Sequence, residues 1–142
     1  MSKVNWVRVF LGGLIATVIC FMTDGFLHEV LVKGDWQAVF DALHAPAPMH
    51  EGSAYCYFGI FELGRGFLAL FVYVMMRARS GAGPKTAVWA GVVSWFAFSL
   101  TGPAQFIPLG FFSTELWVKA SVFQLITSVV ATLGGAVLYK ES

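Results

Sequence analysis

The sequence predicts an all-α integral membrane protein built as a four-helix bundle. Of its 142 residues, 58% are hydrophobic and 12% are charged, and the mean hydropathy is +0.74. A soluble domain carries about 25% charged residues. The apolar residues are concentrated in four runs, each near the length of about 20 residues that crosses the hydrocarbon core of a bilayer. Backbone groups in lipid must bond within their own segment, so these runs are expected to be helices.

The four runs predict one domain, residues 1–142, with spans at about 6–31, 55–76, 86–101 and 115–139. The first run, roughly Trp6 to Val32, is too long for the hydrophobic core of a signal peptide, and no small-x-small cleavage site follows it. We therefore expect it to be retained as the first span.

The connection between spans one and two is expected to contain a short amphipathic helix. Trp36, Val39, Phe40 and Leu43 recur at helical spacing, and Asp35 precedes them where it can cap the helix. Such a helix lies on the membrane surface. The other connection on this side, residues 102–114, is too apolar for a solvated loop and is expected to lie at the interface or dip into the membrane.

Basic residues near the span ends predict the orientation. One side has only Lys33 and Lys119, and the other has Lys3, Arg8, Arg77, Arg79, Lys85 and Lys140. Cytoplasmic ends of spans carry the excess of Lys and Arg, so both termini are expected in the cytoplasm. In architecture alone the chain resembles the small four-span proteins of bacterial inner membranes. That resemblance implies an inner (plasma) membrane location and carries no functional residue with it.

Each span carries small or polar residues at steps of three and four, which places them on one helix face. Small residues let helices approach closely, and polar residues can bond across the interface. We expect these stripes to face inward: Gly13, Thr17, Cys20, Asp24 and His28; Gly59, Glu62, Gly66, Ala69 and Tyr73; Ala87, Gly91, Ser94, Phe98 and Thr101; Ala120, Gln124, Thr127, Ala131 and Gly134.

The polar members of these stripes share a depth. Asp24, Glu62 and Gln124 lie about 10–14 Å below the predicted outer surface, at about 1.5 Å per helical residue. Arg65 lies one turn deeper and His28 one turn shallower. Charged groups in the hydrocarbon core are rare and usually face a partner or a cavity. These five residues form the candidate ligand- or ion-binding site, expected to open toward the outside, with Arg65 bridging to a carboxylate across the helix interface.

Three interpretations of this polar layer remain open. The ionic groups could pair only to fix helix register, Glu62 with Arg65 and Asp24 with His28. They could bind an ion, a proton or a small polar ligand. They could also form a docking surface for another membrane subunit.

The residues favour a non-enzymatic function that binds an ion, a small polar ligand or a membrane partner. No nucleophile with its base, phosphate-binding loop, metal-ligand spacing or haem ligand pair is present, so we expect no catalytic residue, metal or cofactor. A net charge of +1 without a basic patch argues against a nucleic-acid partner. The expected partners are the lipid bilayer and, because four spans make a thin bundle, a second copy or a larger complex.

Two alternatives are a proton-coupled transporter acting as a homo-oligomer and an enzyme on lipid or quinone substrates. The second stays open because Arg65 could hold a phosphate or a carboxylate.

Overall fold

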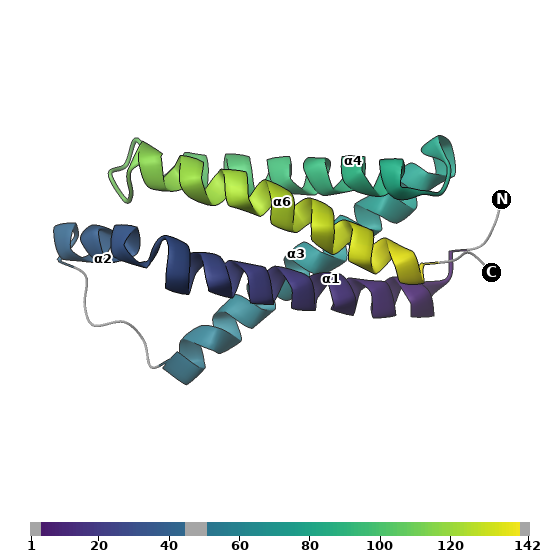
Figure 1. Cartoon of the computed structure of the whole chain (residues 1–142), viewed down its shortest axis with the longest axis horizontal. Helices are drawn as coiled ribbons and strands as arrows, with labels where there is room; N and C mark the ends of the chain where they lie inside the picture. Colours follow the sequence, from purple (N-terminus) through teal and green to yellow (C-terminus); the bar gives the residue numbers. More distant parts are fainter. Residues whose placement is uncertain (1–3, 45–50, 140–142) are drawn as a thin grey trace.

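The structure, a computed structural model, describes residues 4–44 and 51–139, without the side chain of Glu51. All regular elements in these residues are helical, which confirms the all-α prediction. Figure 1 shows their arrangement. In chain order they are α1 (Trp6–Phe26), the π-helical turn η1 (Leu27–Leu31), α2 (Lys33–Ala42), α3 (Glu51–Ser80), α4 (Pro84–Trp95), the π-helical turn η2 (Phe96–Leu100), α5 (Thr101–Ala104) and α6 (Thr114–Leu138).

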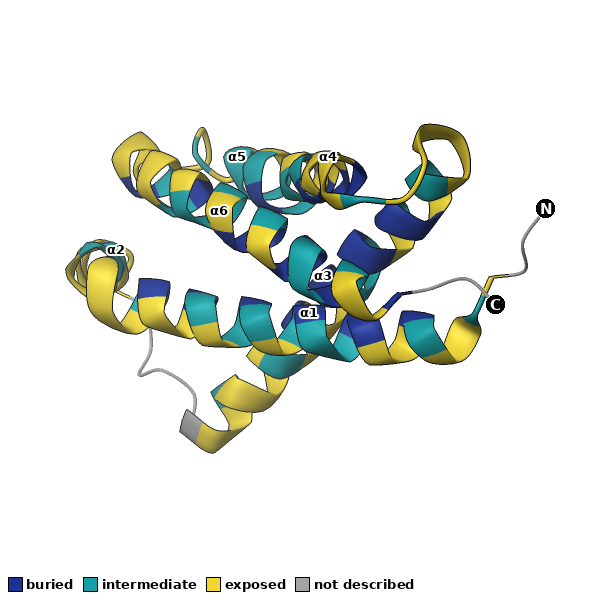
Figure 2. Cartoon of the chain, turned by 45° about the vertical axis from the view of Figure 1, so that its right-hand side comes forward, coloured by how far each residue is buried: buried dark blue, intermediate teal, exposed yellow. Residues whose placement is uncertain are grey.

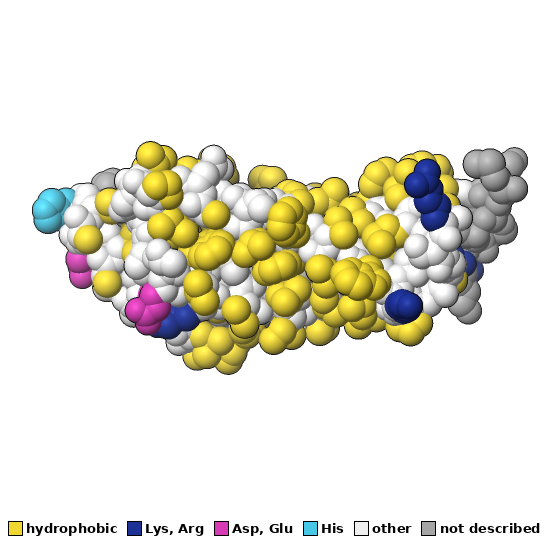
Figure 3. Space-filling view, turned by 90° about the horizontal axis from the view of Figure 1, so that it is seen from above, with side chains coloured by type: hydrophobic (Ala, Val, Ile, Leu, Met, Phe, Trp, Pro, Cys, Tyr) yellow, Lys and Arg dark blue, Asp and Glu magenta, His cyan; other side chains and the backbone are white. Residues whose placement is uncertain are grey.

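The protein is membrane-embedded, because its long helices are apolar along their lengths. Within the described residues, four helical segments are long and apolar enough to cross a bilayer: Trp6–Leu31, Gly52–Ser80, Pro84–Ala104 and Thr114–Leu138. In Figure 3 hydrophobic side chains cover the middle of the face shown, and charged side chains lie toward its two ends. This distribution matches a hydrocarbon belt flanked by two aqueous interfaces.

The second and third spans are longer than predicted. The third span continues past Thr101 although Pro103 follows, because side chains of α6 bond the carbonyl groups that the proline region leaves free. Proline has no N–H to donate to the carbonyl of Ser99. The Ser121 hydroxyl donates to this carbonyl at 3.4 Å, and the Trp117 indole N–H donates to the carbonyl of Leu100 at 3.1 Å.

The helices pack closely through small residues, of which Gly66 belongs to a predicted stripe and Gly12 and Gly135 adjoin the predicted Gly13 and Gly134. α1 lies against α3 and α6, and α4 lies against α6 and α3. Gly12 of α1 and Gly135 of α6 meet so closely that a Cβ on either would come within 2.6 Å of the other's carbonyl oxygen. Gly66 of α3 meets the backbone of Thr17 in the same way. Figure 2 shows that the buried residues face the inside of the bundle.

Most stripe residues are buried or half-buried, as predicted, but Thr101 is exposed. The π-helical turn η2 explains this difference. A π-helix bonds residues five apart, so it inserts an extra residue and rotates the helix beyond it. Ser99, five residues after the buried Ser94, is buried instead of Thr101.

The predicted amphipathic helix is present as α2, but Asp35 does not cap it. The helix begins at Lys33, directly after the turn at Val32, and in the described residues no side chain caps its start. Asp35 lies in the first turn instead, where its carboxylate accepts hydrogen bonds from Lys119 of α6 at 3.3 Å. Trp36 and Val39 pack toward the bundle, whereas Phe40 is exposed.

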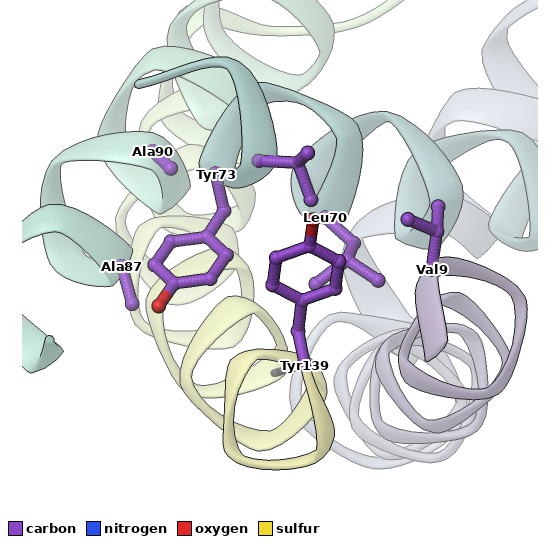
Figure 4. Packing of buried hydrophobic residues seen from close by; sticks show 7 residues of the cluster. Val9, Leu70, Tyr73, Ala87, Ala90 and Tyr139 are labelled. Atoms are coloured by element: carbon purple, nitrogen blue, oxygen red, sulfur yellow. The ribbon is translucent and has the colours of Figure 1, made fainter. Parts of the chain in front are cut away.

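The two ends of the bundle differ. Figure 1 places α2 at one end and both chain termini at the other, and we call these the α2 end and the terminal end. At the terminal end a cluster of buried side chains fills the centre: Val9, Leu70, Tyr73, Val74, Ala87, Ala90 and Tyr139. Figure 4 shows this cluster, in which the Tyr73 and Tyr139 rings lie edge to face at 6.2 Å. The bundle is therefore closed by side chains at the terminal end.

Candidate functional site

Four of the five predicted site residues come together in one hydrogen-bonded cluster. The Arg65 guanidinium donates to both carboxylate oxygens of Asp24, at 2.5 and 3.3 Å, and to Oε1 of Glu62 at 3.2 Å. The Gln124 side-chain amide donates to Oδ2 of Asp24 at 2.8 Å. These contacts join α1, α3 and α6. The predicted bridge from Arg65 to a carboxylate across the helix interface is confirmed.

The ionic cluster, Asp24, Glu62 and Arg65, is removed from solvent and lipid. The three residues are 5%, 4% and 2% exposed. Arg65 lies in the same layer as the carboxylates, whereas the sequence placed it one turn deeper. Helical side chains lean toward the N-terminus of their helix. Since α3 begins at the α2 end, the long Arg65 side chain extends back to the level of Glu62.

The two carboxylates are not equally satisfied. Asp24 accepts two hydrogen bonds from Arg65 and one from Gln124, so both of its oxygens are bonded. Glu62 accepts one bond at Oε1, and within the described parts of the chain its buried Oε2 has no hydrogen-bond partner. One guanidinium thus serves two carboxylates, and the cluster carries a net negative charge when both are ionised.

A cavity of about 800 Å³ lies beside this cluster, toward the α2 end. Asp24, Glu62 and Gln124 are among its lining residues, so the cluster forms a polar patch in its wall. The remaining wall is mostly apolar and rich in aromatic rings, which come from every span and from α2: Phe21, Trp36, Tyr55, Phe58, Phe61, Phe98 and Trp117 among them. The site is therefore a large aromatic cavity with one small polar patch.

His28, the fifth predicted residue, lines the same cavity but does not bond to Asp24 in the structure. Its Nδ1 accepts a hydrogen bond from the Trp36 indole N–H at 2.8 Å. Trp36 in turn packs edge-on against Phe112 at 5.9 Å. His28 therefore ties α2 to the bundle at the cavity wall. The suggested pairing of Asp24 with His28 is not observed, because Arg65 and Gln124 bond both oxygens of Asp24.

Sequence reasoning missed the aromatic side of the site. The residue pattern predicts Trp36 on a surface helix, and it places neither Phe61 nor Trp117 in an inward stripe. In the structure Phe61 lies beside Phe98, with ring centroids 5.7 Å apart, and all four rings line the cavity. Phe98 belongs to a predicted inward stripe, but for the other rings the only signal was the aromatic content, 16% of the chain, which does not locate them.

No group of three or more His, Cys, Asp or Glu side chains in residues 4–44 and 52–139 is arranged to hold a metal ion. Comparison with known proteins gave no match to a family model, a curated protein or a solved structure.

Proposed function

We propose that this protein is a non-enzymatic membrane protein that binds a small molecule in the cavity beside Asp24, Glu62, Arg65 and Gln124. The observation that carries the proposal is the buried Oε2 of Glu62, which has no partner among the described residues and belongs to a residue that lines the cavity. Buried polar atoms are almost always hydrogen-bonded, so an exception calls for a partner. A bound molecule entering the cavity supplies one.

The shape and chemistry of the cavity support binding. Ligand pockets measure about 300–1,000 Å³ and combine apolar walls with a few placed polar groups. The cavity has this size and this composition. A purely structural ion cluster would pair its groups one to one, because buried ions are costly unless their hydrogen bonds are complete. Here Asp24 has complete hydrogen bonds and Glu62 does not.

Because the terminal end is closed, the bundle supports binding of a small molecule in the cavity better than its transport through a single chain. The buried cluster around Tyr73 and Tyr139 fills the bundle between the cavity and the terminal end. A transport path would need these side chains to separate.

The cavity is proposed to open toward the outside of the cell, because the Lys and Arg bias favours a cytoplasmic location for the terminal end. We expect cysteines introduced at Ser53 and Ser80, at the two ends of α3, to be labelled from opposite sides of the membrane by an impermeant maleimide. The background is Cys56→Ser, since Cys56 is exposed and Cys20 is buried. Labelling of Ser80→Cys from outside would invert the orientation.

Binding is tested at Ala120, which lines the cavity on α6. In the Cys56→Ser background, a water-soluble methanethiosulfonate should modify Ala120→Cys at least about tenfold faster than Val122→Cys, because hydrocarbon keeps a thiol in its unreactive protonated form. Val122 is 59% exposed and lies outside the cavity lining, about 3 Å away along the same helix. Octan-1-ol should then slow the modification of Ala120→Cys by occupying the apolar cavity.

Equal rates at the two positions would contradict an accessible cavity. A rate at Ala120→Cys that octan-1-ol leaves unchanged would contradict binding within it.

A further inference from the structure

We propose that the ligand of this cavity is a lipophilic amine, whose protonated amino group donates a hydrogen bond to Glu62 Oε2 while its apolar body lies among the aromatic rings. This inference rests on the proposed function and names the class of ligand.

The charge of the ionic cluster favours a cation over an anion or a neutral molecule. The only guanidinium in the cluster makes two contacts to Asp24 and one to Glu62, at 3.2 Å. The Gln124 amide is also directed at Asp24, and the buried Arg65 Nε–H has no partner among the described residues but belongs to a residue that does not line the cavity. An anionic ligand would add charge to a site that already has an excess of carboxylate. A cation beside Glu62 neutralises that excess.

The unsatisfied atom favours a cation that carries N–H groups. Glu62 Oε2 is an acceptor without a donor among the described residues. A carboxylate oxygen forms its strongest bonds with charged donors. A primary ammonium group offers both the charge and the donor, whereas a quaternary ammonium offers the charge alone.

The cavity wall favours an ammonium group attached to an apolar body. Phe61 neighbours Glu62 in the chain, and its ring lies 5.7 Å from that of Phe98. Aromatic faces attract ammonium ions within about 6 Å, and they also accept apolar groups. Phe58 and Trp117 line the same cavity. The site therefore accommodates a charged head at Glu62 and an apolar body beyond it.

The test compares four octyl compounds that differ only in the head group: octylammonium, octyltrimethylammonium, octan-1-ol and octanoate. Each is assayed for protection of Ala120→Cys, in the Cys56→Ser background, in nanodiscs of zwitterionic phosphatidylcholine. Half-protecting concentrations are expressed per lipid after the partitioning of each compound is measured. This correction removes differences in membrane affinity from the comparison.

Octylammonium is expected to protect at a concentration about tenfold below that of octan-1-ol, the ratio expected for one charge-assisted hydrogen bond. Octyltrimethylammonium should protect less well than octylammonium, and octanoate should be the weakest. Glu62→Gln should remove the advantage of octylammonium and leave protection by octan-1-ol unchanged. Protection by octan-1-ol also reports whether the variant keeps its cavity. If Glu62→Gln loses the cavity, the head-group series in the protein with Glu62 intact decides.

Equal protection by octylammonium and octan-1-ol would overturn the assignment of a lipophilic amine, and the proposed binding function would stand. Stronger protection by octanoate would overturn it in favour of an anion held by Arg65. An advantage of octylammonium that survives Glu62→Gln in an intact cavity would overturn the role of Glu62. Protection by none of the four would overturn both the amine and the proposed function.

Discussion

Replacing Arg65 with methionine is expected to lower the free energy of unfolding by about 3–5 kcal/mol, the cost of removing one partner from a buried ion pair. The substitution leaves Asp24 and Glu62 facing each other without a cation, at 5% and 4% exposure. Gln124 remains as the single donor to Asp24. The measurement is unfolding in mixed micelles titrated with a denaturing detergent.

Two further variants separate the loss of the ion pair from a general effect of removing an arginine. Adding Asp24→Asn to Arg65→Met should restore part of the lost stability, because one uncompensated charge is then removed. Arg79→Met, at an exposed position near the end of α3, should change stability by no more than about 0.5 kcal/mol. Strict additivity of Arg65→Met and Asp24→Asn would show that the two residues are not energetically coupled.

Gly135→Ala is expected to lower the free energy of unfolding by about 1–3 kcal/mol, the usual cost of overpacking. The new Cβ would lie 2.6 Å from the backbone oxygen of Gly12 and 3.4 Å from the Cβ of Ala16. A backbone atom cannot rotate away as a flexible side chain can. α1 and α6 must therefore separate, and the same detergent titration measures the result.

Gly64→Ala is the matched control, because it makes the same chemical change on α3 where no heavy atom lies within 4 Å of the new Cβ. Alanine stabilises a helix relative to glycine by up to about 1 kcal/mol, so this variant should be as stable as the parent or slightly more stable. A loss as large as that of Gly135→Ala would mean that helix contact at Gly12 and Gly135 does not limit the packing.

The spans, the inward stripes and the depth of the polar layer were determined by the sequence, because each follows from a property local to one helix. Comparing the length of each apolar run with the thickness of the bilayer locates a span to within a few residues. Helical periodicity places Cys20 and Asp24 on one face, and Glu62 and Gly66 on another. Counting at about 1.5 Å per residue brings Asp24, Glu62 and Gln124 to one level, although they come from three helices.

Which groups bond within that level was decided by the tertiary structure. From the sequence, Arg65, His28 and Gln124 could each have bonded to Asp24. The relative rotation of α1, α3 and α6 makes Arg65 and Gln124 its donors. The same rotation leaves Glu62 Oε2 without a donor among the described residues. The π-helical turns η1 and η2 shift the helical register of the residues that follow them. The sequence pattern did not predict either turn.

The cavity is likewise a property of the assembled bundle. Its wall takes Trp36 from α2, Phe61 from α3, Phe98 from η2 and Trp117 from α6. The apolar character of these residues suits lipid and cavity equally well, so periodicity cannot tell the two apart. Only the angles between the helices, set by close contacts such as that between Gly12 and Gly135, decide which aromatic faces meet the bilayer and which enclose the cavity.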